Sequence, residues 1–122
     1  MPAPSLIAII EDDDSLRPAL IGLARSLGYE GEGYASAEAF LDAGAQHRAA
    51  CLVTDLQLPG LGGLELIAKL AALGQPLPTI VITARGEAAL EERAQACGAL
   101  CLLRKPFGAD VLNAAVERAL DS

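Results

Sequence analysis

The chain of 122 residues has no tryptophan, one methionine and only 3% aromatic residues, so leucine, alanine, isoleucine and valine must build its core. Positive charge is scarce too: 9 lysines and arginines face 16 aspartates and glutamates, for a net charge of −7. A domain with this balance lacks the basic surface that holds nucleic acid or anionic lipid. We therefore expect no direct nucleic-acid binding by this domain and no membrane binding. Most of the acidic residues are expected to form an ordinary solvated surface.

Cysteine is limited to three residues, and no Cys-x-x-Cys pair occurs. The odd number and the spacing argue against a disulfide framework and against a thiolate zinc site. Cys51 and Cys101 lie in apolar runs and are interpreted as small core residues, with Cys97 structural as well. No apolar run approaches the length of a membrane-spanning helix, and the initial MPAPS is interpreted as a lead-in rather than a targeting signal. These features favour a reducing cytoplasm and a single domain over residues 1–122.

Short apolar runs alternate five times with segments of helical periodicity. The alternation predicts an α/β protein whose parallel sheet carries helices on both faces. A flavodoxin-like (βα)5 doubly wound five-stranded sheet of strand order 2-1-3-4-5 places the polar, glycine-rich second strand at an edge, which suits its composition. Strands are expected at residues 6–10, 29–35, 50–55, 79–83 and 100–104, and helices at 15–28, 37–45, 64–73, 86–98 and 109–120.

Helix ends carry recognisable signals. Asp14 or Ser15 is expected to cap the first helix, Ser36 the second, and Gly108 or Asp110 the last. Each of these residue types suits the start of a helix, where backbone N–H groups lack partners.

Polar residues stand at the carboxyl ends of four predicted strands. Glu11 and Asp12 follow the first strand, Asp55 ends the third, Thr83 ends the fourth and Lys105 follows the fifth. In an open parallel sheet these ends share one edge, and ligands bind where the strand order reverses. For the order 2-1-3-4-5 this point lies between the first and third strands. We therefore expect the three acids to converge although they are distant in sequence.

Three converging carboxylates need a counter-charge. Two carboxylates ~5 Å apart repel by roughly 3 kcal/mol at an effective dielectric constant of ~20. Mg²⁺ or Mn²⁺, with oxygen ligands and retained waters, is the simplest remedy. Lys105 adds an ammonium and Thr83 a hydroxyl, so the set suits a phosphoryl group that Asp55 attacks as the nucleophile. Singly, each residue has an ordinary structural explanation, as Asp13 and Asp14 have at a helix N-terminus; their joint placement favours the functional interpretation.

The stretches IIEDD, LVTDLQLPGLGGLEL, PTIVITA and LLRKPF resemble the response regulator receiver domains, the CheY-like family of two-component signalling, over about residues 6–120. The resemblance implies that Asp55 accepts a phosphoryl group from the phosphohistidine of a sensor histidine kinase. It implies that Asp12, Asp55 and the backbone carbonyl of Gln57 ligate Mg²⁺, while Glu11 acts mainly through water. The protein would be a switch more than an enzyme, although it would catalyse its own phosphorylation and slow dephosphorylation.

The resemblance assigns further contacts. Thr83, Lys105 and the backbone N–H groups of Leu56 and Ala84 would contact the phosphoryl group, and the bond before Pro106 would be cis. Phosphorylation would reshape the face made by the fourth helix, fifth strand and fifth helix. That face would meet an output domain or partner protein, or form a homodimer through the fourth helix and fifth strand.

Two positions depart from the family pattern. Leu102 stands where the family usually carries an aromatic switch residue, so coupling between Thr83 and a rotating ring is not available in its usual form. Arg85 and Gln57 stand two residues after Thr83 and Asp55, at positions that influence the lifetime of the phosphoryl group in the family. We expect these two residues to tune that lifetime.

Three interpretations compete. The loop pattern VTDLQLPGLGGLEL resembles receivers attached to DNA-binding helix-turn-helix modules, which favours control of a transcription output. A phosphohydrolase of the haloacid dehalogenase type needs a second acid two residues after its nucleophile, and Gln57 occupies that position. A pseudo-receiver, a protein-interaction module that is not phosphorylated, would lack an essential acid, Thr or Lys; none is missing, and only Leu102 keeps this alternative open.

Overall fold

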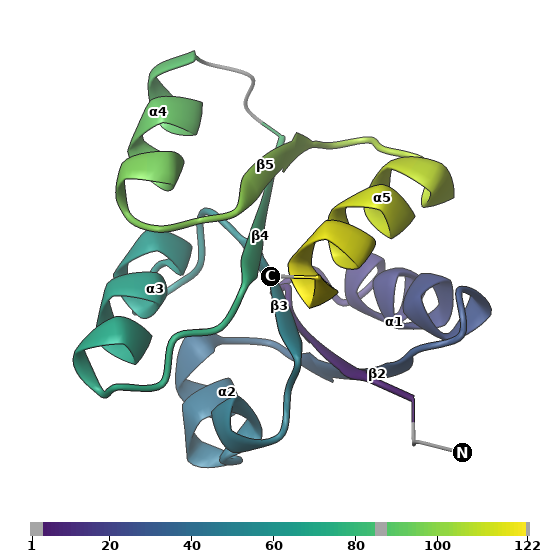
Figure 1. Ribbon diagram of the computed structural model, residues 1–122, viewed down its shortest axis with the longest axis horizontal. Helices are drawn as coiled ribbons and strands as arrows, with labels where there is room; N and C mark the ends of the chain where they lie inside the picture. Colours follow the sequence, from purple (N-terminus) through teal and green to yellow (C-terminus); the bar gives the residue numbers. More distant parts are fainter. Residues whose placement is uncertain (1–3, 85–87, 122) are drawn as a thin grey trace.

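The computed structural model describes residues 4–84 and 88–121 and shows a parallel sheet between two layers of helices (Figure 1). Arg85 and the first three residues of the lead-in lie outside the described residues. The elements are β1 (Leu6–Ile10), α1 (Leu16–Ser26), β2 (Glu30–Tyr34), α2 (Ala37–Asp42), a 3-10 turn (Ala45–His47), β3 (Cys51–Asp55), α3 (Gly63–Ala72), β4 (Thr79–Thr83), α4 (Ala88–Ala96), β5 (Cys101–Arg104) and α5 (Ala109–Leu120).

The sheet has the order β2-β1-β3-β4-β5, and every neighbouring pair is parallel. Helices α1 and α5 cover one face, and α2, α3 and α4 cover the other (Figure 1). The predicted fold class and strand order are confirmed. Since β1 and β3 are neighbours with Ile10 opposite Thr54, the residues that follow these two strands emerge side by side.

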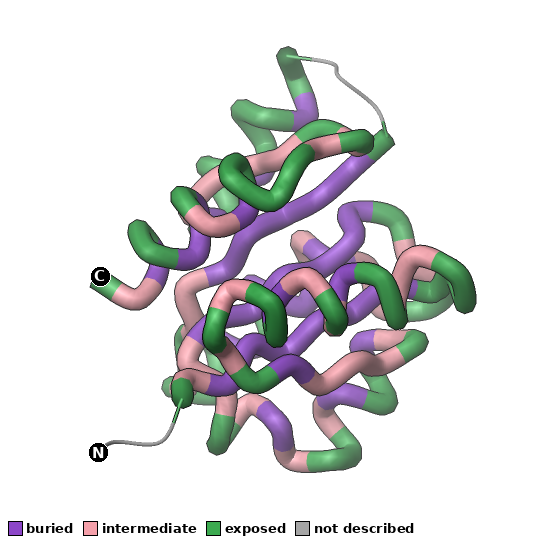
Figure 2. The backbone as a smooth tube through the Cα atoms, turned by 90° about the vertical axis from the view of Figure 1, so that its right-hand side faces the viewer, coloured by how far each residue is buried: buried purple, intermediate pink, exposed green. Residues whose placement is uncertain are grey.

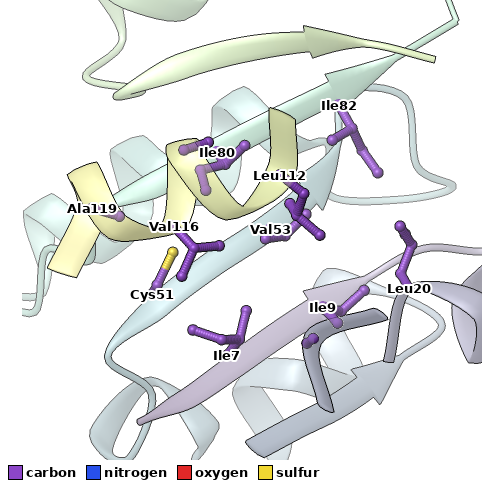
Figure 3. Close-up of a cluster of buried hydrophobic side chains, with 12 residues drawn as sticks. Ile7, Ile9, Leu20, Cys51, Val53, Ile80, Ile82, Leu112, Val116 and Ala119 are labelled. Carbon is purple, nitrogen blue, oxygen red and sulfur yellow. The ribbon is translucent and has the colours of Figure 1, made fainter. Parts of the chain in front are cut away.

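The core follows the alternation of side chains along the strands. Ile7 and Ile9 of β1 point to the α1 and α5 side, where Val116 and Leu112 of α5 meet them (Figure 3). Ala8 and Ile10 point to the opposite side, toward α2 and α3. Because both faces are covered, the central strands β1, β3 and β4 are buried along their length, while the edge strands β2 and β5 are only partly buried and the helices keep an exposed outer side (Figure 2). Among the described residues, no helix is long and apolar enough to span a membrane.

The three cysteines are free and differ in exposure. Cys51 lies in the core, where burial raises the pKa of its thiol to about 12. Cys101 is half-buried, and burial raises its thiol pKa as well. Cys97 is exposed, and its interpretation as a structural residue stays a prediction.

The helix caps agree in part with the sequence. The hydroxyl of Ser36 accepts a hydrogen bond from the Ala39 N–H at 3.1 Å, as predicted. At α1, however, the capping carboxylate belongs to Asp13, whose Oδ1 accepts from the N–H groups of Ser15 at 2.7 Å and Leu16 at 3.0 Å. Ser15 occupies the cap position without a side-chain bond of its own.

Candidate functional site

Three carboxylates meet at the carboxyl edge of the sheet. Glu11 and Asp12 follow β1, Asp55 ends β3, and one oxygen of each lies within 4.8 Å of the others. The strand order produces this cluster, because β1 and β3 are adjacent and parallel although their ends are far apart in sequence. The expected convergence of the acids is therefore present.

Lys105 reaches the cluster from the fifth strand. Its Nζ donates to Glu11 Oε1 at 2.7 Å and to Asp55 Oδ2 at 3.0 Å, so its side chain points into the site. The peptide bond between Lys105 and Pro106 is cis, as predicted. Burial by itself lowers the pKa of Lys105, but the hydrogen bonds to the two carboxylates outweigh it and raise the pKa above its usual value. The ammonium group is therefore charged in the physiological range.

Glu11 is the most buried member of the cluster, with 1% of its surface exposed. Burial is the main influence on the pKa of its carboxyl group, which is raised, while the hydrogen bond from Lys105 acts in the opposite direction. Its Oε2 accepts a further hydrogen bond from the Asp13 N–H at 3.2 Å. Both oxygens of Glu11 are thus engaged by the protein, whereas Asp12 is exposed to solvent.

The donor set fits a hard divalent cation. The cluster holds three carboxylates, and the Lys105 ammonium pairs with two of them, Glu11 and Asp55, so a negative charge remains that a single Lys105 does not cancel. Carboxylate oxygens together with retained waters are the ligands that Mg²⁺ prefers. The exposed Asp12 and the partly accessible Asp55 would meet such a cation first, and Glu11, turned toward Lys105, would stand behind them.

The backbone donors around Asp55 differ from the expectation at one residue. The Leu56 N–H, expected to face a phosphoryl group, instead donates to the Ile82 carbonyl at 2.9 Å, because it extends the pairing of β3 with β4. The Gln57 N–H lies beyond the strand and donates to Asp55 Oδ1 at 3.2 Å. Gln57, and not Leu56, therefore directs an amide toward the carboxylate.

The other expected residues lie around this edge. Thr83 is buried at the end of β4, and Ala84 follows it exposed. Leu102 is half-buried and packs against the apolar cluster that joins the sheet to α3 and α4. Arg85 lies outside the described residues, so its expected influence on phosphoryl lifetime stays a prediction.

The loop after Asp55 is held from two sides. The Glu38 carboxylate of α2 accepts a hydrogen bond from the Leu61 N–H at 3.1 Å, which lowers the pKa of Glu38. At the other end, Gly63 begins α3 directly against Asp55: a Cβ at Gly63 would lie 2.5 Å from the Asp55 carbonyl oxygen.

Substitution of Gly63 by alanine is therefore expected to destabilise the protein by about 1–3 kcal/mol, because backbone must move to admit the methyl group. Gly62→Ala is the matched control, since a Cβ there would meet a Glu65 carboxylate oxygen at 3.3 Å, and that long side chain can turn away. Urea unfolding monitored by circular dichroism measures the free energy of unfolding of both variants. Equal stability of the two variants would contradict the close approach of α3 to Asp55.

Comparisons with known proteins agree with this geometry. The family model described as "Response regulator receiver domain" matches residues 7–117. The transcriptional regulatory protein FixJ of Azorhizobium caulinodans is 40% identical over 120 residues, covering 98% of this chain and 57% of that protein. Response regulator protein TmoT of Ectopseudomonas mendocina is 36% identical, covering 95% of this chain and 53% of that protein. The chain thus spans about half the length of the curated relatives it matches.

Solved structures show the same similarity. The structure titled FixJ-N superposes with a TM-score of 0.88 at 34% identity, over 96% of this chain and 94% of that chain. The response regulator StyR superposes with a TM-score of 0.87 at 36% identity, over 98% of this chain and 60% of that chain.

Proposed function

The chain belongs to the response regulator receiver domain family, and we propose that it accepts a phosphoryl group on Asp55 in a reaction that requires Mg²⁺ or Mn²⁺. The observation that carries this proposal is the position of the Asp55 carboxylate, which shares one cluster with Glu11 and Asp12 and lies 3.0 Å from the Lys105 ammonium. The donor is a phosphohistidine of a sensor histidine kinase.

Asp55 acts as the nucleophile. One of its carboxylate oxygens forms a bond to phosphorus while the bond between phosphorus and the imidazole nitrogen of the donor breaks. The imidazole leaves with the bonding electron pair and takes up a proton from water. Apart from the bond that Asp55 forms, a phosphoryl transfer of this kind depends on the protein mainly for positioning the reactants and neutralising their charge.

The surrounding groups supply that neutralisation. The Lys105 ammonium pairs with one phosphoryl oxygen, and the Thr83 hydroxyl and the Gln57 and Ala84 N–H groups donate to the others. Asp12, Asp55 and the Gln57 carbonyl would hold the cation, and Glu11, which holds Lys105, would act on it through water. When bound, Mg²⁺ would supply positive charge that offsets the repulsion between the acceptor carboxylate and the phosphoryl oxygens.

Phosphorylation is proposed to control a transcription output. The proteins similar to this chain include a transcriptional regulatory protein of which it covers about half, so the output belongs to a segment or partner beyond these residues. We propose that the signal passes through the face of α4, β5 and α5, with Leu102 shifting in its apolar cluster instead of rotating a ring. The cytoplasm is the proposed location, since a histidine kinase delivers phosphoryl groups there.

A small acyl phosphate tests the proposal without the kinase. With Mg²⁺, the intact mass of the parent is expected to increase by one phosphoryl group, and Asp55→Asn is expected to gain none. Asp42→Asn, which removes an exposed carboxylate of α2, is the matched control and should behave as the parent does. A folded parent that gains no adduct would favour the pseudo-receiver, a module that binds a partner without being phosphorylated.

A further inference from the structure

The second strand, EGEGY, carries two glycines that the phosphoryl chemistry does not use. Both face α1. A Cβ at Gly33 would lie 2.5 Å from Ile21 Cδ1 and 3.0 Å from Arg17 Cγ, and one at Gly31 would lie 3.2 Å from the Ile21 carbonyl oxygen. The glycines therefore leave the space that the side chains of α1 occupy against β2. At Gly33 this space is filled partly by the aliphatic stem of Arg17.

The head of Arg17 ends at the acidic loop. Its Nη1 donates to the Glu11 carbonyl oxygen at 2.9 Å, and its Nη2 donates to Asp14 Oδ1 at 2.7 Å. The Arg17 side chain is only 21% exposed, so the guanidinium is held between the loop and the strand rather than free in solvent. Asp14, at 89% exposed, fixes the other side of the guanidinium.

The carbonyl that Arg17 holds belongs to the peptide unit joining Glu11 to Asp12. The Glu11 N–H, on the other side of the same residue, donates to the Tyr34 carbonyl of β2 at 3.0 Å. The two bonds fix the backbone just before and just after the Glu11 side chain. They therefore set the directions in which the Glu11 and Asp12 carboxylates leave the chain.

We propose that Arg17, extended across Gly33, is a positioning residue for the metal site: it fixes the main chain from which Glu11 and Asp12 project and so raises the affinity for Mg²⁺. This inference rests on the proposed function, because it presupposes a cation at the acidic cluster. Groups that orient the ligands of a metal without touching it commonly change metal affinity by about 10–100-fold.

The sign of the effect separates positioning from simple electrostatics. The Arg17 guanidinium contacts the Glu11 carbonyl and Asp14, so it makes the potential at the acidic loop less negative, and its removal would by charge alone strengthen Mg²⁺ binding. Loss of positioning weakens binding instead, because Asp12 must then be ordered when the cation binds. The two effects act in opposite directions, and we expect positioning to dominate.

The test is a calorimetric titration of Mg²⁺ into the parent, Arg17→Met, Arg17→Lys and Arg25→Met. Methionine keeps a stem over Gly33 but removes the charge and the donors, whereas lysine keeps the charge and one donor. Arg25 is the matched control, because it lies on the same helix and its Nη2 approaches the Gly31 carbonyl at 3.4 Å, away from the acidic loop. Circular dichroism in EDTA establishes that each variant is folded.

We expect about tenfold weaker Mg²⁺ binding for Arg17→Met, an intermediate affinity for Arg17→Lys, and parental affinity for Arg25→Met. Parental or tighter binding by a folded Arg17→Met overturns the proposal, as does an equal loss in Arg25→Met. If Arg17→Met does not fold, Arg17→Lys decides, and parental affinity in that variant overturns the proposal. A parent that binds no Mg²⁺ overturns the proposed function itself, whereas a parent that binds it while the Arg17 variants are unchanged overturns only the role of Arg17.

Discussion

Lys105→Met is expected to slow the phosphorylation of Asp55 by about 100-fold, because the phosphoryl oxygens lose the ammonium that neutralises them during transfer. The substitution also leaves Glu11 buried without its partner at 2.7 Å. An unsatisfied buried polar group costs about 1–3 kcal/mol and a charged one costs more, so the metal-free protein should unfold at lower urea concentration. Mg²⁺ should restore part of that stability, because a cation at the cluster replaces some of the missing positive charge.

Rates of adduct formation from an acyl phosphate, followed by intact mass, measure the first effect, and urea unfolding in EDTA and in Mg²⁺ measures the second. Lys69→Met is the matched control, because Lys69 is an exposed lysine of α3. A parental phosphorylation rate in Lys105→Met would show that the ammonium has no part in the transfer. Equal losses in Lys69→Met would mean that the more negative net charge of the protein, and not the loss of the Lys105 contacts, is responsible.

Asp12→Asn is expected to remove most of the stabilisation that Mg²⁺ gives. A ligand that binds only the folded state raises the free energy of unfolding by about 2.7 kcal/mol when its free concentration is 100 times its dissociation constant. The parent should show this gain between EDTA and Mg²⁺, because binding a cation ends the repulsion within the cluster. In EDTA alone, Asp12→Asn should be more stable than the parent, since one of three repelling carboxylates is gone.

Urea unfolding followed by circular dichroism is the measurement, since the chain has no tryptophan to report by fluorescence. Asp42→Asn is the control, because the Asp42 side chain is exposed on α2 and lies outside the cluster. Full Mg²⁺ stabilisation of Asp12→Asn would exclude Asp12 as a ligand. Loss of stabilisation in Asp42→Asn as well would indicate diffuse attraction of the cation to the acidic surface.

Much of the fold follows from local sequence, because apolar runs buried on both faces have few alternatives to a parallel sheet. The strand order then brings Asp55 beside Asp12 without any further information. The structure adds a short 3-10 turn at Ala45–His47, which the sequence analysis missed. Three residues at the end of a helical segment carry no periodicity from which such a turn could be predicted.

The predictions that were wrong concern individual hydrogen-bonding groups and not the helices and strands themselves. The N-terminal acids of α1 are consecutive, and composition does not decide which carboxylate folds back on the helix; the structure selects Asp13. Leu56 was expected to offer its N–H to a ligand, but whether a strand's pairing ends at Asp55 or one residue later depends on the register with β4. The contact of Arg17 with the Glu11 carbonyl was missed because it depends on how closely α1 approaches β2. The glycines of β2 were the one signal in the sequence that could have indicated that approach.

The central claim is that acids from the ends of β1 and β3 share one cation beside the nucleophile. A crystal of the parent soaked in Mn²⁺ and measured at the manganese absorption edge tests it most directly. The account predicts one anomalous peak within about 2.0–2.2 Å of carboxylate oxygens of both Asp12 and Asp55, with the Lys105 Nζ still at Asp55. A peak elsewhere on the acidic surface, or carboxylates of Asp12 and Asp55 that ligate no common ion, would contradict it.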